Sequence, residues 1–434
     1  MAAFILAALA ATGALAQAIE WSDPQRVAAA AVDASPSIRA LEAEIDAARE
    51  AVRSAGALPN PMAMAGVQNL NDDLSNDEMM TMYMVGASQA FVPGARRESL
   101  ERAGDATARA LEANRKTLEA EVRRDAVAAW IGIASIDERR EVVRTVLTVT
   151  DAMIASSRAR YESGSAIQAD ILRAQLVRSD LQHEVLSLDG ERLIAEASLR
   201  SLLGLEASAE IPTLHLQHEE PAPPAGPIVS DAHAAIAALE AEVERWSAEI
   251  DLAKSATRPD WSVEASYGYR PETNGMITVL GKVELPVRRE KTIEPRIREA
   301  IARREAALRR IEELRRSLAE QAAIAGAVLD QSVKQLKFHH EVLVPQAKLA
   351  FDATLAAYQT ARADFEALLG SESAYVRLAT DYYEFLERAL RGRADLAALQ
   401  EGARTIRVGA AAVSASGAAS ATNGGAQTSS MSSM

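Results

Sequence analysis

The stretch "IRALEAEI" (residues 38–45) returns almost unchanged as "IAALEAEV" (residues 236–243), 198 positions further along a chain of 434 residues. The similarity extends beyond this stretch, because Pro61 and Pro259 follow the two copies at the same offset. Self-similarity at a fixed offset is the signature of repeated structural units. The chain is therefore predicted to be an internal duplication whose two halves fold alike.

Each copy carries two stretches that alternate between apolar and polar residues. After Pro259, for example, Trp261 and Val263 fall on one face, while Ser262 and Glu264 fall on the other. A period of two is typical of a half-buried strand and also of a strand in a membrane barrel. The sequence predicts strands at about 61–70, 79–91, 260–270 and 275–286.

Long helices account for most of the remaining chain. Only 4% of the residues are aromatic although 48% are hydrophobic, and the segment 94–211 contains no proline. Apolar residues recur there in steps of three and four, which is typical of coiled-coil packing. The sequence predicts long helices at about 94–160, 166–203, 290–358 and 364–402.

Composition also sets the predicted domain boundaries. A Pro-rich linker separates the two repeats. The tail is rich in Ala, Ser and Gly and uncharged from about Ala410, and it is expected to be disordered. The predicted parts are a first repeat at 19–205, a linker at 206–230, a second repeat at 231–405 and a tail at 406–434.

The first residues and the overall charge restrict the location and the partners. The apolar run "MAAFILAALAATGALAQA" (residues 1–18) ends in small residues, which predicts a cleaved secretory signal peptide. The chain has no cysteine, and this excludes disulfides and thiolate sites. A net charge of −14 argues against a protein that binds nucleic acid.

Motifs for catalysis or cofactor binding are weak. The pair His215 and His218 lacks the HExxH arrangement of a zinc site, and we interpret it as part of a solvated loop. His339 falls on a coiled-coil seam, where a polar residue fixes helix register. The stretch "GMITVLGKV" (residues 275–283) departs from a phosphate-binding loop in its glycine spacing. We therefore predict no catalysis, no cofactor and no resident metal ion.

Methionines gather in the first pair of predicted strands. Six of the eleven in the chain lie there, and thioethers favour soft ions such as Cu(I). The alternative is that methionine serves as a flexible apolar filler on a strand that faces lipid. Both interpretations stay open, and the candidate contacts for a soft metal are Met62, Met64, Met80, Met82 and Met84.

Two further stretches resemble the TolC family of outer membrane efflux proteins. "SQAFVPGARR" (residues 88–97) is similar to the family's passage from strand to long helix, as are the strand entries after Pro61 and Pro259. "RYESGSAIQADILRAQ" (residues 160–175) resembles the family's helix turn, and the matched residues are Tyr161, Gly164, Asp170, Ala174 and Gln175. The second copy departs from the pattern, because Ala361 replaces the glycine, and Ala367 and Gly370 replace a pair of aspartates.

The resemblance implies a mainly α fold with a membrane β-barrel: a homotrimer with one twelve-stranded barrel and a periplasmic helical tunnel. It also implies a position in the outer membrane, a periplasmic adaptor and an inner-membrane efflux pump as partners. The expected function is passive exit of substrates delivered by that pump. The stretch "MTMYMVGASQAF" (residues 80–91) is similar to members that serve heavy-metal pumps, so copper-like or silver-like cations are the expected substrates.

Alternatives remain within and outside the channel class. The same channel could export small organic compounds or secreted polypeptides, and a periplasmic coiled-coil adaptor is the alternative of another class. In the channel, the expected residues at the periplasmic tip are Tyr161, Gly164, Asp170, Tyr358, Asp364 and Glu366. Carboxylates there would form a cation-selective ring or would only cap helices. The expected residues of the barrel lumen are Glu264, Lys282 and Glu284.

Overall fold

The computed structural model describes residues 19–69, 81–218, 220–230, 232–270, 274–360 and 362–406. The expected signal peptide and nearly all of the expected tail lie outside these residues. The chain forms two compact units, and both repeats contribute to each unit. The first unit combines residues 1–36, 117–230 and 317–434, and the second combines residues 37–116 and 231–316.

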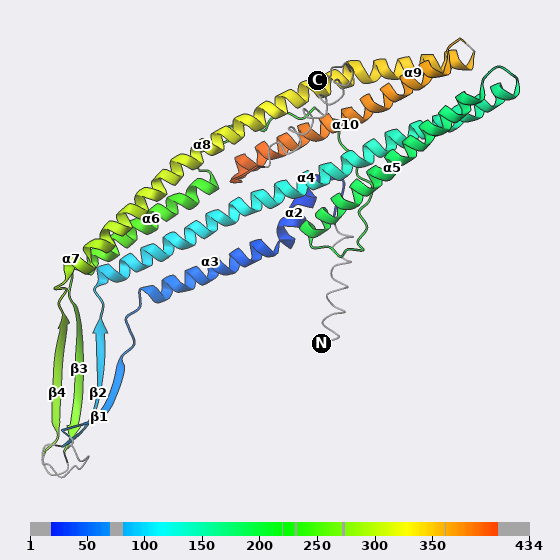
Figure 1. Ribbon diagram of the computed structural model, residues 1–434. Coiled ribbons are helices and arrows are strands. Elements are labelled where there is room, and N and C mark those ends of the chain that lie inside the picture. The colour runs from blue at the N-terminus through cyan, green and yellow to red at the C-terminus, as the bar shows by residue number, and fades with distance from the viewer. Residues whose placement is uncertain are drawn as a thin grey trace, which may run out of the picture. The chain divides into compact units, whose positions relative to one another are not determined.

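The second unit contains one antiparallel sheet in the order β1-β2-β3-β4 (Figure 1). Each repeat supplies one hairpin, and the β2–β3 pairing joins the two repeats. The strands are β1 (Met62–Gln68), β2 (Met82–Phe91), β3 (Asp260–Tyr269) and β4 (Met276–Glu284). They are shorter than expected, and Met79 and Met80 of the predicted second strand lie outside the described residues.

The sheet is fixed to the helices of the same unit at the place where β2 ends and β3 begins. Phe91 stacks on its cross-strand partner Trp261 with ring centroids 4.2 Å apart. Arg96, in the first turn of α4 (Gly94–Glu162), donates to Asp260 at 2.6 Å. Pro93 precedes α4, where the missing N–H costs nothing because the first turn of a helix has no internal acceptor for it.

The helices of the second unit include α3 (Pro36–Ala55), α6 (Ala234–Ser255) and the beginnings of two much longer helices. The helix α4 runs for 69 residues, or roughly 100 Å at the α-helical rise, and contributes to both units. No described helix is long and apolar enough to cross a membrane.

The predicted single helix at 290–358 is divided into several elements. They are α7 (Arg289–Thr292), α8 (Glu294–Phe338), the π-helical turn η1 (His339–Leu343) and α9 (Val344–Gln359). Proline explains the interruptions, because Pro295 lies in the first turn of α8 and Pro345 has no N–H for the carbonyl four residues before it. The N–H of Val344 accordingly donates to the carbonyl of His339, five residues back.

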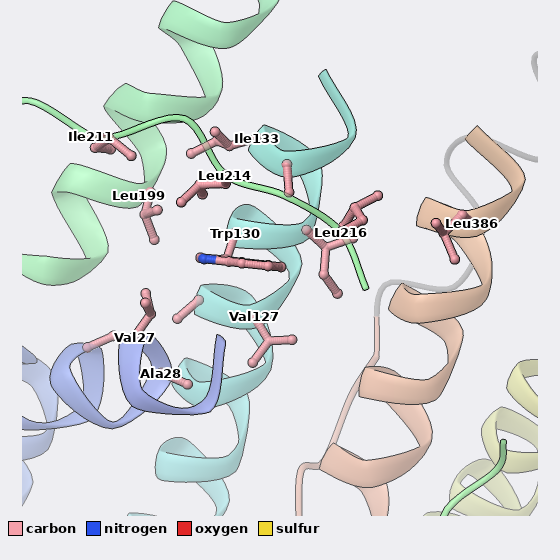
Figure 2. Close-up of a cluster of buried hydrophobic side chains, with 14 of the residues drawn as sticks. Val27, Ala28, Val127, Trp130, Ile133, Leu199, Ile211, Leu214, Leu216 and Leu386 are labelled. Carbon is pink, nitrogen blue, oxygen red and sulfur yellow. The ribbon is translucent and has the colours of Figure 1, made fainter. Parts of the chain in front are cut away.

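The first unit also contains α2 (Pro24–Ala34), α5 (Gln168–Leu203) and α10 (Phe365–Glu401). Its core is shown in Figure 2. Trp130 of α4 lies at its centre and donates its indole N–H to the carbonyl of Trp21 at 2.8 Å. Around it pack buried side chains of α2, α4, α5 and the segment after α5, among them Val27, Ala28, Val127, Ile133, Leu199, Ile211, Leu214 and Leu216.

The segment predicted as a Pro-rich linker is therefore part of the core. Ile211, Leu214 and Leu216 are buried, while their polar neighbours are exposed. The alternation of apolar and polar residues in "TLHLQH" (residues 213–218) indicated a half-buried segment. The surrounding prolines instead led to its interpretation as a linker.

A buried ion network holds this segment against the helices. The Asp137 side chain of α4 is 0% exposed; it accepts from Arg192 of α5 at 2.7 Å and lies 3.1 Å from Arg140. Its second oxygen accepts the backbone N–H of Leu214 at 3.0 Å. Arg192 also donates to the carbonyls of Ile211 and Pro212 at 3.2 and 3.0 Å. One carboxylate thus joins α4, α5 and the connecting segment.

We predict that Asp137→Ala lowers the unfolding free energy by about 3–5 kcal/mol, because it leaves two arginines and a backbone N–H without their buried acceptor. The control is Asp352→Ala, whose carboxylate makes an exposed pair with Lys348 at 2.9 Å, and we expect a loss of about 1 kcal/mol or less there. Thermal and urea unfolding of the purified protein measures both changes. Equal losses for the two variants would contradict the assignment.

Candidate functional site

The sheet has two chemically different faces. Residues that are directly opposite on paired strands project to the same side, so the register connects Met62, Ser88, Glu264 and Leu280 on one face. We call this side the polar face. Its other members include Met64, Met82, Met84, Ser262, Ser266, Met276, Thr278, Lys282 and Glu284.

The opposite face is apolar and more exposed. It carries Val67, Tyr83, Val85, Trp261, Val263, Tyr267, Ile277, Val279 and Val283. Along β3, Tyr267 is 46% exposed whereas the adjacent Ser266 on the polar face is 6% exposed. The same alternation runs along β2. On β2 and β3 the polar-face side chains are thus more sheltered than their apolar neighbours.

The three candidate lumen residues all lie on the polar face. Glu264 and Lys282 form a diagonal ion pair at 2.5 Å between β3 and β4. Glu284 lies opposite Asp260 in the register. The structure therefore brings these charges together on one face of the sheet, opposite the apolar face.

The described methionines of the first hairpin also lie on the polar face, and Met80 lies outside the described residues. Gly268 is the register partner of both Met84 and Met276. The Met82 sulfur lies 2.6 Å from the position that a Cβ on Gly268 would occupy. Three methionines therefore lie next to one glycine. Sequence reasoning missed Met276, because only the cross-strand register places it beside the others.

The candidate histidine pair has separate partners. His215 lies 3.2 Å from Glu138, and the Nδ1 atom of His218 lies 3.2 Å from the Tyr382 hydroxyl. His339 is buried and its ring packs at a tilt against that of Phe385. Within the described residues, no group of three or more His, Asp or Glu side chains could hold a metal ion.

Both helix reversals lie at the same end of the first unit (Figure 1). In the first, Gly164 has φ +74°, which favours glycine, and its N–H donates to the carbonyl of Tyr161 at 3.0 Å. In the second, the N–H of Arg362 donates to the carbonyl of Ala357 at 2.8 Å. The described residues of the second turn all have negative φ.

The two tyrosines that precede the turns differ in environment. Tyr358 is 2% exposed, and its hydroxyl lies 2.9 Å from Ser157 Oγ. Arg160 donates to the Tyr358 carbonyl at 2.8 Å, and its guanidinium lies 4.5 Å from the ring centroid. Tyr161, by contrast, is 47% exposed. The tyrosine that precedes the turn is therefore buried in the second repeat and exposed in the first.

Comparisons with known proteins agree with this architecture. A sequence model of the outer membrane efflux protein family matches residues 27–205. Over these residues the chain therefore matches the family that its sequence resembles, the TolC family. Its predicted mainly helical, TolC-like fold is confirmed. The predicted position in the outer membrane, extending into the periplasm, is confirmed. The matched family is one of channels.

Solved structures share the fold at low sequence identity. The outer-membrane channel OprN matches with a TM-score of 0.73 and 17% identity over 88% of this chain and 91% of that one. VceC from Vibrio cholerae matches with a TM-score of 0.72 and 17% identity over 88% of this chain and 97% of that one. CusC matches with a TM-score of 0.74 and 15% identity over 87% of this chain and 91% of that one. A comparison with curated protein sequences found no significant match.

The candidate tip carboxylates have different surroundings. Asp364 is the N-cap of α10 and accepts the N–H of Ala367 at 2.8 Å. Glu366 pairs with Arg173 of α5 at 3.3 Å, and both side chains are more than half exposed. Asp170 lies in the first turn of α5. Capping therefore accounts for Asp364, while Glu366 links the two turns.

The sequence analysis did not select one further carboxylate, which is buried between two helices of the first unit. Glu372 of α10 is buried and accepts from the Thr150 hydroxyl of α4 at 2.6 Å. Burial raises the pKa of Glu372, and the hydrogen bond from Thr150 only partly opposes this. The charge pattern of α10 gave no sign of this burial.

We predict that the triple variant Asp170→Asn, Asp364→Asn and Glu366→Gln lowers single-channel conductance and cation preference, because carboxylates at a constriction favour cations. Planar-bilayer recordings measure both quantities. The matched control is Asp330→Asn, Glu341→Gln and Asp352→Asn, which removes three exposed carboxylates elsewhere on α8, η1 and α9. Unchanged conductance and selectivity in the tip variant would show that these residues do not form the constriction.

Proposed function

We propose that this protein is the outer-membrane exit channel of a tripartite efflux pump. Substrates delivered by an inner-membrane pump and a periplasmic adaptor would leave passively through it. The observation that carries the proposal is a four-stranded sheet with one face that carries charged side chains and one apolar face. A periplasmic coiled-coil adaptor would have no need for such a sheet.

The sheet also supports a homotrimer. In the described part of the chain, β1 and β4 each pair on one side only. Open edges are costly in lipid because every backbone N–H and C=O must be satisfied internally. Two chains would give about eight strands, enough only for a barrel filled by side chains, whereas about twelve strands from three chains leave space for water.

Apolar side chains on α5 give independent support. Leu172, Leu176, Leu186, Leu193 and Ile194 are all more than half exposed. Exposed apolar surface of this extent marks a contact surface. A second copy of the chain would cover it, so α5 of the first unit would pack between protomers. In the second unit, β1 and β4 would pair between protomers.

Cysteine cross-linking tests the trimer, since the chain has no native cysteine. We predict that Ala65→Cys on β1, combined in turn with single cysteines along Met276–Glu284 of β4, gives covalent trimers for the β4 positions that lie beside Ala65 across the interface. Cross-linking should recur at alternate residues only, because successive side chains of a strand project to opposite faces. Ala65→Cys alone is the control. Native mass spectrometry that shows only monomers or dimers would contradict the proposal.

For the partners, we propose that the two helix turns form the periplasmic tip and dock the adaptor. The turns are joined by the Glu366–Arg173 pair and by the buried Tyr358. These contacts hold both reversals in one cluster with Phe351 and Phe365. A docking partner would therefore meet one rigid surface built from both repeats.

For the substrate, we propose soft heavy-metal cations such as Cu(I) or Ag(I). The methionines share the polar face with Glu264, and Met82, Met84 and Met276 lie next to Gly268. Thioethers bind soft ions, and carboxylates attract cations. The alternative substrates are small organic compounds or polypeptides, which the width of a twelve-stranded lumen would also admit.

We predict that deletion of the gene raises sensitivity to Ag(I) and copper more than to dyes or bile salts. Complementation with Met82→Leu, Met84→Leu and Met276→Leu together should restore tolerance only in part, because leucine keeps the apolar volume and removes the sulfur. The control is Met153→Leu, a buried methionine of the helical core, which should restore tolerance fully. Equal tolerance in both complemented strains would exclude a role for the three sulfurs.

A further inference from the structure

A pocket in the first compact unit is walled mainly by aromatic rings. Its volume is about 320 Å³, and five of its eight lining residues are histidine or tyrosine. They come from three parts of the chain: His218 from the segment after α5, His340 from η1, and three tyrosines from α10. Those tyrosines are Tyr375, Tyr382 and Tyr383.

The rings of this pocket are held in a defined arrangement. Tyr382 stacks with His340 at a centroid distance of 5.6 Å and with His218 at 6.2 Å. Tyr383 meets Tyr382 edge to face at 5.0 Å. The contact of His218 Nδ1 with the Tyr382 hydroxyl at 3.2 Å fixes both side chains.

The π-helical turn supplies one wall. A π turn inserts one residue into the helix, and such turns recur at functional sites. Here the two adjacent histidines of the turn have different environments. His339 is buried against Phe385, with ring centroids 4.7 Å apart, and His340 is exposed beside Tyr382. Without the extra residue, His340 would be rotated away from its present position over the ring.

The charges around the pocket favour a cation. The Tyr383 hydroxyl is hydrogen-bonded to Glu138 of α4, and burial together with this carboxylate raises the pKa of Tyr383 to about 12. Burial and Glu138 also raise the pKa of Tyr382. Both phenols therefore stay neutral at physiological pH. Within the described residues, the lining of this pocket includes no lysine or arginine.

We propose that this pocket binds an organic cation, with a quaternary ammonium or a protonated amine against the faces of Tyr382 and its neighbours. Aromatic faces attract such cations through their quadrupoles, and Glu138 adds a negative charge nearby. A metal ion fits less well, because the described residues hold no suitable cluster of ligands. An anion would be repelled by Glu138. The inference goes beyond the channel function and does not rest on the exported substrate.

Calorimetric titration of the full-length protein in a neutral detergent tests the proposal. The probe is benzyltrimethylammonium, and the matched probe is benzenesulfonate, which has the same ring and the opposite charge. We expect saturable binding of the cation and no binding of the anion. Binding of both probes alike, or of neither, would overturn the proposal.

Substitutions then locate the binding. His218→Leu, His340→Leu and Glu138→Gln should each weaken binding of the cation by roughly 2- to 30-fold, the range of one cation–aromatic or charge contact. Tyr382→Phe keeps the ring and should retain most of the affinity. The control is His183→Leu, an exposed histidine of α5 outside the pocket.

Affinity that is unchanged in the double variant His218→Leu and His340→Leu would place the probe elsewhere and overturn the proposal. Thermal unfolding of each variant shows whether the fold is intact. Trimer formation and conductance are measured separately, so failure of this inference leaves the channel proposal standing, and the reverse also holds.

Discussion

The pairing of β2 with β3 is the contact on which the rest of the sheet depends. It joins a hairpin from each repeat into one continuous sheet. Without it the chain would have two isolated hairpins, each marginal in water. With it, the chain has one sheet with one polar and one apolar face, and the unpaired sides of β1 and β4 become the places where another chain can add strands.

The register of that sheet also decides the chemistry of each face. A shift of one residue would exchange the faces, and Glu264, Lys282 and the methionines would move to the apolar side. The stacking of Phe91 on Trp261 and the bond between Arg96 and Asp260 both oppose such a shift at the end next to the helices. Gly268 contributes differently, because the absence of a Cβ leaves room for the Met82 side chain.

The sequence predicted the helices and strands well, but it predicted the burial and the neighbours of individual side chains poorly. Alternation and apolar spacing indicated four strands and the long helices, since these patterns depend on local geometry. The thioether cluster depends on cross-strand register, which the sequence does not state, so Met276 was missed. Tyr161 and Tyr358 occupy equivalent places in the repeat, yet only Tyr358 is buried, because tertiary packing decides burial. Pro345 did signal the π turn, but the apolar spacing on both sides suggested an uninterrupted helix.

The segment between the repeats shows how a duplicated chain loses its symmetry. A linker would only need to span the distance from α5 to α6, but this one places Leu214 in the core and its N–H on Asp137. Asp137 and Arg192 both belong to the first repeat, so they hold the outgoing chain in one path. That path brings His218 to Tyr382 of the second repeat. The pocket beside the π turn therefore depends on the packed connection, which holds His218 against Tyr382. A flexible spacer of the same length would not hold His218 there.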